Sequence, residues 1–220
     1  MIDVPAERAN EVAPLQETLG YRFSDLRLLN KALTHKSYVN EKNEVLKHNE
    51  RFEFLGDSVL DVMVSNYLVC EYSDYAEGTL SKIRAAVVNE NCLAGLARKI
   101  ELGKFLLLGK GEDKSGGRDK SSILADAFEA LAGALFRDSG LESTSNVILP
   151  ILVDKISAFA CSCDFRDFKS ELQEYTQNKW FCTPSYKVVN ELGPDHAKEF
   201  EVTVMINSKV KGQGLGKNKK

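Results

Sequence analysis

The sequence lacks an apolar run of the ~18 residues that a membrane-spanning helix requires, so we expect no insertion into a membrane. Its first residues, MIDVPAERANEVAPLQ, lack the basic and apolar segments of a secretory signal. Its five cysteines include no CxxC pair, and their odd number is typical of reduced thiols in a cytosolic protein. These absences together predict a cytoplasmic protein.

The sequence also lacks a dominant charge. Its 220 residues carry a formal net charge of −3, so no global field indicates a nucleic-acid partner. The charge is nevertheless divided unevenly, because residues 165–220 contain ten basic and seven acidic side chains while residues 1–164 carry an excess of six acids. This modest asymmetry indicates that the C-terminal part binds an acidic partner.

Hydrophobic periodicity of the helical kind dominates the chain up to about residue 160. Ser24 is the expected N-cap of an early helix, and Asn89 is the expected cap between two later ones. The charged, glycine-rich stretch GKGEDKSGGRDKSS, residues 109–122, predicts a mobile loop. The strong helix that follows is expected to end at Gly140, and a further helix over residues 145–159 completes an all-helical first domain.

The pattern changes after CSCDF. A short helix, DFKSELQEYTQNKW, precedes three stretches with strand character, PSYKVVNEL, KEFEVTVMI and SKVKGQGLG, of which the second alternates with period 2. We therefore expect a mainly α protein, in which an all-helical domain precedes a small α+β domain of order α-β-β-β. The expected boundaries are a loose leader at 1–13, the helical domain at 14–141, its last helix and a linker at 142–164, and the second domain at 165–220.

Two of the predicted helices each carry a pair of acids in apolar surroundings. Glu53 and Asp57 are four residues apart in HNERFEFLGDSVLDVM, and Asp126 and Glu129 are three apart in LADAFEALAGA. Each pair therefore projects from one face of its helix. Four carboxylates that met between two helices would repel one another unless hard divalent cations lay among them. Oxygen ligands of this kind suit Mg²⁺ or Mn²⁺ and metal-assisted phosphodiester hydrolysis.

The spacing alone leaves a simpler interpretation open, in which each pair lies on a solvated helix face. Spacing does not show that the two helices face each other. A di-iron centre between helices would need a Glu-x-x-His motif. None of the three histidines, His35, His48 and His196, follows a glutamate at that spacing.

Four stretches carry a resemblance to a known family. NERFEFLGDSVL, residues 49–60, is similar to the signature of bacterial ribonuclease III, and LADAFEALAGAL resembles the second acidic helix of that family. ALTHKSY (32–38) and EGTLSKIRAAVV (77–88) also match its pattern. The C-terminal part resembles the double-stranded RNA-binding domain that follows the nuclease domain there, so the resemblance covers nearly the whole chain.

The resemblance implies a homodimer that binds double-stranded RNA between its subunits, each of which cuts one strand. Mg²⁺ would be the metal, with Mn²⁺ as a substitute, and the products would have 5′-phosphate and 3′-hydroxyl ends with a short 3′ overhang. The substrates would be ribosomal RNA precursors and other structured transcripts, including messenger and transfer RNAs.

Carried onto the matching positions, the resemblance makes Glu53, Asp126 and Glu129 the metal ligands and makes Asp57 and Glu129 the catalytic residues. Asp57 would orient the attacking water, and the loss of Glu129 would be the most damaging. Glu50, one helical turn before Glu53, is an accessory candidate that positions RNA or the dimer partner, with a solvated or capping role as the alternative.

Double-stranded RNA is read mostly by shape, through contacts to 2′-hydroxyls and phosphates. In the C-terminal domain, Gln173 and Gln177 would reach the minor groove from one helix face, and His196 would contact RNA from the loop GPDHAKEF. Phosphate binding is assigned to three terminal lysines: Lys217, Lys219 and Lys220. The second helix of the family's domain is missing after GKNKK. Two interpretations are open, a trimmed version of a longer chain and a crippled RNA-binding module. We favour trimming and expect this C-terminally truncated domain to have weakened affinity.

Two alternatives belong to other functional classes. A non-catalytic relative that serves as a ribosome-assembly scaffold would be expected to lose one or more of the four acids, and all four are present. A small processing nuclease without an RNA-binding module is disfavoured by residues 165–220.

Overall fold

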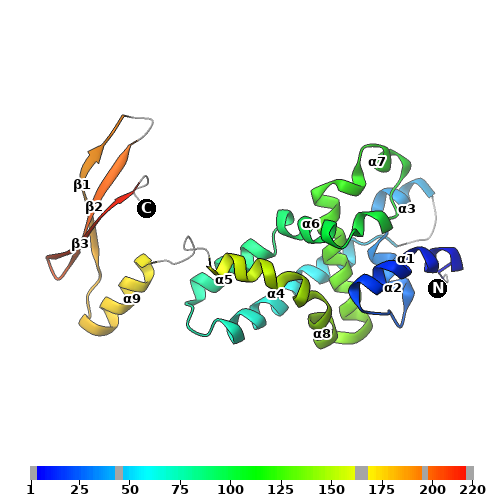
Figure 1. Ribbon diagram of the computed structural model, residues 1–220, viewed down its shortest axis with the longest axis horizontal. Coiled ribbons are helices and arrows are strands. Elements are labelled where there is room, and N and C mark those ends of the chain that lie inside the picture. Colours follow the sequence, from blue (N-terminus) through cyan, green and yellow to red (C-terminus); the bar gives the residue numbers. More distant parts are fainter. Residues whose placement is uncertain (1–3, 43–46, 162–167, 195–197, 217–220) are drawn as a thin grey trace. The chain divides into compact units, whose positions relative to one another are not determined.

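The computed structural model describes residues 4–42, 47–161, 168–194 and 198–216. The chain divides into two compact units, Met1–Phe165 and Arg166–Lys220 (Figure 1). The first is helical, and the second is a helix followed by three antiparallel strands. The predicted fold class is therefore confirmed.

The first unit is built around α8, which packs against α4, α6, α2 and α5 (Figure 1). Its elements in chain order are α1 (Ala6–Leu19), α2 (Leu26–Ala32), α3 (Lys36–Lys42), α4 (Glu50–Glu71), α5 (Glu77–Val87), α6 (Glu90–Lys99), the 3₁₀ turn η1 (Leu102–Phe105), α7 (Lys110–Lys114), the 3₁₀ turn η2 (Gly117–Asp119) and α8 (Ser121–Cys161). Helix α8 changes direction at Gly140, whose backbone is non-helical with φ 79°, so the predicted helix end at this glycine is confirmed.

Helices α4 and α8 approach so closely that each needs a glycine at the contact. A Cβ on Gly56 would lie 1.8 Å from the backbone oxygen of Glu129, and one on Gly133 would lie 2.3 Å from that of Phe52. Around this contact α4 buries residues three or four positions apart, Phe52, Gly56 and Val59. The face of α4 that carries Glu53 and Asp57 is therefore held beside α8 by backbone-to-backbone contact.

The N-terminal expectation was wrong in part. Residues 6–13 belong to α1 and are not a loose leader, because α1 buries Val12 and Leu15 in the core of the first unit. The cap of α2 also differs from the prediction, since Asp25 rather than Ser24 accepts the backbone N–H of Arg27. The cap predicted at Asn89 is confirmed by its Oδ1, which accepts the N–H of Cys92 at 2.9 Å.

The stretch 109–122 is ordered, which corrects the predicted loop. It forms α7 and η2, and both are held by residues distant in sequence. Glu41 accepts the backbone N–H groups of Lys110 and Gly111 at 2.8 and 3.1 Å, which satisfies donors at the start of α7. Long-range contacts of this kind are invisible to local sequence patterns.

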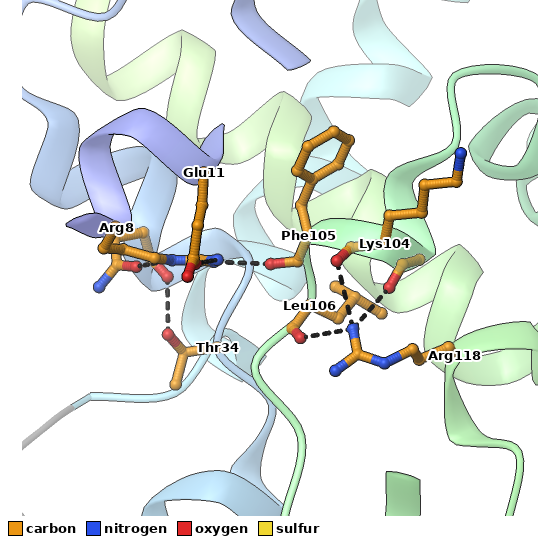
Figure 2. Close-up of polar contacts among 9 residues, drawn as sticks. Arg8, Glu11, Thr34, Lys104, Phe105, Leu106 and Arg118 are labelled. Carbon is orange, nitrogen blue, oxygen red and sulfur yellow. Dashed lines mark hydrogen bonds and ion pairs between the residues drawn. The ribbon is translucent and has the colours of Figure 1, made fainter. Parts of the chain in front are cut away.

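Two arginines hold the segment around η1 by its carbonyl groups (Figure 2). Arg8 donates to the carbonyl oxygen of Phe105 at 2.6 Å. Arg118 donates to the carbonyl oxygens of Gly103 and Leu106 at 3.0 and 2.9 Å. Because Arg8 belongs to α1 and Arg118 to η2, these contacts join the N-terminal helix and the 109–122 stretch to one turn.

The second unit consists of α9 (Phe168–Trp180) and a sheet of order β1-β2-β3, with β1 (Ser185–Leu192), β2 (Glu199–Ile206) and β3 (Lys209–Gly216). The three strands lie where the sequence predicts them. The alternation expected in β2 is imperfect, because Thr203 and Ile206 are buried while Val202 and Val204 are only half-buried.

Among the described residues, α8 is long and apolar enough to cross a membrane, but a core helix of a water-soluble protein passes the same test. The first half of α8 is such a core helix, since Ile123, Phe128 and Leu131 are all buried.

We expect Gly56→Ala to destabilise the first unit by about 3 kcal/mol, because the added methyl group overlaps a backbone oxygen that cannot move without displacing α8. The measurement is chemical unfolding followed by circular dichroism. Gly95→Ala is the matched control, since Gly95 lies in α6 with nothing within 4 Å of its would-be Cβ. It should be neutral or about 0.5 kcal/mol stabilising. Equal effects of both changes would contradict the close-contact argument.

Candidate metal centre

The two acidic helices do face each other. Glu53 from α4 and Asp126 and Glu129 from α8 each offer a carboxylate oxygen, and these oxygens lie within 4.8 Å of one another. All three side chains are partly buried. We call these three residues the carboxylate cluster. The close approach at Gly56 and Gly133 produces it, because Glu53 lies three residues before Gly56. The α8 backbone that Gly56 contacts is that of Glu129, which lies three residues after Asp126.

The carboxylate cluster carries more negative charge than the neighbouring cations neutralise. The pKa of Glu129 is raised to about 7, first by burial and then by the charges of Asp57, Asp126 and Glu53, in that order. Burial first, and then neighbouring carboxylates, also raise the pKa of Glu53 and of Asp126. The folded chain therefore holds carboxylates together at a cost that a bound cation would remove.

Asp57 lies beside the carboxylate cluster without belonging to it. It is exposed, and after burial its charge is the largest influence on the pKa of Glu129. Glu50 lies further out and is also exposed, with its Oε1 3.1 Å from the Nζ of Lys36 and its Oε2 3.6 Å from the Nδ1 of His48. The structure thus places three of the predicted acids together and sets Asp57 and Glu50 at the edge.

The donor set fits a hard divalent cation. Three partly buried carboxylates without a thiolate or imidazole among them are ligands that Mg²⁺ and Mn²⁺ prefer. The interpretation of two separate solvated faces does not hold for Glu53, Asp126 and Glu129, because their carboxylate oxygens lie within 4.8 Å of one another and all three residues are partly buried.

Two of the six predicted RNA-binding residues belong to the part of the chain that the structure describes. Gln173 and Gln177 are exposed on α9, on either side of the buried Thr176, so both are free to meet a ligand from one helix. His196, Lys217, Lys219 and Lys220 lie outside the described residues.

Sequence reasoning missed Lys36. The residue belongs to the stretch ALTHKSY, but nothing in its spacing connects it with the acids on α4 and α8. Only the fold brings its ammonium group to Glu50, and the charges of Glu53 and Asp126 add to the rise in its pKa that Glu50 causes first.

The raised pKa of Glu129 predicts how stability depends on pH when metal is absent. The carboxyl group ionises near its ordinary value of 4.5 in the unfolded chain and at about 7 in the folded chain. Between these values the folded chain holds more protons, so its stability falls as the pH rises. In chelator, Glu129→Gln should therefore gain stability over the unmodified chain between about pH 5 and 7.5, on the order of 2 kcal/mol after allowance for solvent screening.

Unfolding free energies in denaturant across this pH range measure the difference. A repeat with Mg²⁺ in place of chelator is the control, because a bound cation keeps the carboxylates ionised and should remove the advantage of glutamine. Parallel stability curves in chelator would contradict the raised pKa.

Two family descriptions match the chain. Residues 25–156 match the family described as ribonuclease-III-like, and residues 168–220 match the double-stranded RNA binding motif. A relative named ribonuclease 3 from Caldanaerobacter subterraneus subsp. tengcongensis is 49% identical over 207 residues, which are 94% of this chain and 90% of that protein. Ribonuclease 3 from Borreliella burgdorferi is 43% identical over 214 residues, 97% of this chain and 87% of that protein.

A solved structure supports the same assignment. The nuclease domain of ribonuclease III from Campylobacter jejuni, described with a flexible region involved in dimer formation, superposes with a TM-score of 0.61 at 42% identity. The match covers 66% of this chain and 97% of that one. With a nuclease-like helical unit, a clustered set of carboxylates and an RNA-binding motif in one sequence, the chain belongs to the ribonuclease III family.

Proposed function

We propose that this protein is a Mg²⁺-dependent endoribonuclease that hydrolyses both strands of double-stranded RNA and leaves 5′-phosphate and 3′-hydroxyl ends. The observation that carries the proposal is the carboxylate cluster, three acids within 4.8 Å of one another with raised pKa values. Such a cluster is costly in a folded protein unless it binds a cation. Membership of the ribonuclease III family supports the same reaction.

Each acid has a proposed role. Glu53, Asp126 and Glu129 would hold the metal, and Mn²⁺ can take the place of Mg²⁺ because it accepts the same oxygen ligands. The bound metal would supply an activated water and would stabilise the charge that develops on the phosphate. Asp57, exposed beside Glu129, would accept a hydrogen bond from the attacking water and orient it. The side chains of the protein would then position the reactants, and none of them would act as the nucleophile.

The second unit would supply affinity for the substrate. The match of residues 168–220 to the double-stranded RNA binding motif supports this role. Gln173 and Gln177 would contact the minor groove from α9. The contacts assigned to His196, Lys217, Lys219 and Lys220 remain predictions from the sequence. The proposed substrates are precursors of ribosomal RNA and other structured transcripts in the cytoplasm.

The active form is proposed to be a homodimer. Helix α4 exposes three large apolar side chains, Phe54 at 80%, Val62 at 55% and Val69 at 62%. They are spaced eight and seven residues apart, so they form a stripe along one side of the helix. An exposed apolar stripe of this kind is typical of a protein interface.

The decisive measurement is cleavage of a fully paired RNA stem with added Mg²⁺, comparing the unmodified chain with Glu129→Gln. The unmodified chain should cut both strands. The variant should bind the stem but cut it at least 100-fold more slowly, roughly the effect of removing a group that holds the metal. Glu142→Gln, which changes an exposed acid on the same helix α8, is a matched control that should cut normally. Binding without cleavage by the unmodified chain would contradict the enzyme proposal and favour an RNA-binding scaffold.

The dimer has its own test. Phe54→Glu places a charge on the most exposed residue of the apolar stripe, at its N-terminal end, and should shift the chain from dimer to monomer in sedimentation equilibrium. Phe181→Glu is the matched control, since Phe181 is 93% exposed and belongs to the second unit rather than to α4. A Phe54→Glu chain that remains dimeric would show that the interface lies elsewhere.

A further inference from the structure

Lys36 is carried by a backbone segment that is fixed from several directions. The N–H of His35 donates to the carbonyl oxygen of Leu107 at 3.0 Å, and the N–H of Leu107 donates to that of Leu33 at 2.8 Å. Ser37 accepts the N–H of Gly109 at 2.9 Å on its Oγ, which also lies 2.8 Å from the Nδ1 of His35. Leu107 and Gly109 directly follow the turn η1 and its neighbouring residues, whose carbonyl groups accept hydrogen bonds from Arg8 and Arg118 (Figure 2).

This rigid segment presents a long, exposed cation. The Lys36 side chain is 59% exposed, and its Nζ lies 3.1 Å from Glu50 Oε1, whose side chain is 47% exposed. The second oxygen of Glu50 faces His48 at 3.6 Å. An ion pair between two exposed side chains contributes little to stability. The fixed backbone and the loosely paired head group together indicate a role other than holding the fold.

The head group also lies within electrostatic reach of the carboxylate cluster. Its charge opposes the repulsion felt by Glu53 and by Asp126, and the charges of these two acids act on Lys36 in return. Among the described residues, Lys36 is therefore the cation whose charge most lowers the pKa of two of the three proposed metal ligands, Glu53 and Asp126. A lysine in this position would have three donors directed at whatever anion reaches the cluster.

We propose that Lys36 binds a phosphate oxygen of the RNA backbone next to the carboxylate cluster, exchanging its contact with Glu50 for one with the substrate. The inference rests on the proposed function, because it takes RNA to be the anion that arrives. Lysine binds phosphate as a mobile point charge. Glu50 keeps the ammonium group beside the site in the absence of RNA and retains His48 as a neighbour after the exchange.

The salt dependence of binding tests the contact without cleavage. In a Glu129→Gln background, the affinity for a paired RNA stem is measured at a series of salt concentrations. Adding Lys36→Ala should make the slope of log affinity against log salt shallower by about one, the value expected for one lost phosphate contact. Lys36→Arg should keep the slope. Lys99→Ala is the matched control, because Lys99 is equally exposed at 60% and is paired with Asp154 at 3.6 Å.

The cleavage rate supplies a second measurement. In an otherwise unmodified chain, Lys36→Ala should lower single-turnover cleavage at subsaturating RNA roughly ten- to hundredfold, the range for one charged hydrogen bond. The Mg²⁺ concentration at half-maximal rate should stay the same or fall, since a cation beside the cluster has been removed.

An unchanged salt slope for Lys36→Ala relative to Lys99→Ala would overturn the proposal. A raised Mg²⁺ requirement with an unchanged slope would assign Lys36 a role in shaping the cluster and would also overturn the phosphate contact. If the unmodified chain did not cleave RNA, the proposed function alone would be wrong. The slopes of log affinity against log salt would still decide whether Lys36 contacts RNA.

Discussion

The close approach of α4 and α8 at Gly56 and Gly133 is the constraint on which the proposed metal centre depends. Without these glycines the two backbones could not touch, and the acids on either side of the contact would be separated. The approach is maintained by a continuous apolar core on both helices, which includes Phe52 and Phe128. Packing energy far from the carboxylates therefore offsets the repulsion that bringing them together creates.

The repulsion among the carboxylates favours their protonated forms. The pKa of Glu129 is raised to about 7 by burial and by three neighbouring acids, so near neutral pH the metal-free site is only partly ionised. A divalent cation reverses this balance, because it interacts with every carboxylate at once and favours their charged forms. The fold therefore assembles the site before metal binds. The clustered carboxylates lower the stability of the metal-free chain, and metal binding restores that stability. Such preorganisation is the usual condition for positioning a reacting phosphate.

The sequence predicted the elements well and the tertiary contacts poorly, for a physical reason. Helix spacing correctly placed Glu53 with Asp57 and Asp126 with Glu129 on single faces, but no spacing could show that the two faces meet. That step came from the resemblance to a family. The stretch 109–122 was misread because α7 is stabilised by Glu41, which lies about seventy positions earlier in the chain. Lys36 was missed for the same reason, as its partners are brought to it only by the fold.

The proposed metal and RNA sites share their charges, and this couples the two ligands. RNA phosphate would bring negative charge to a cluster that already repels itself, so it cannot bind there well without a cation. Lys36 at the edge and the metal at the centre would both reduce that repulsion. By thermodynamic reciprocity, a metal that strengthens phosphate binding is itself bound more tightly when RNA is present. The second unit would then hold RNA by shape, while engagement of RNA at the proposed metal centre would depend on metal and phosphate binding together.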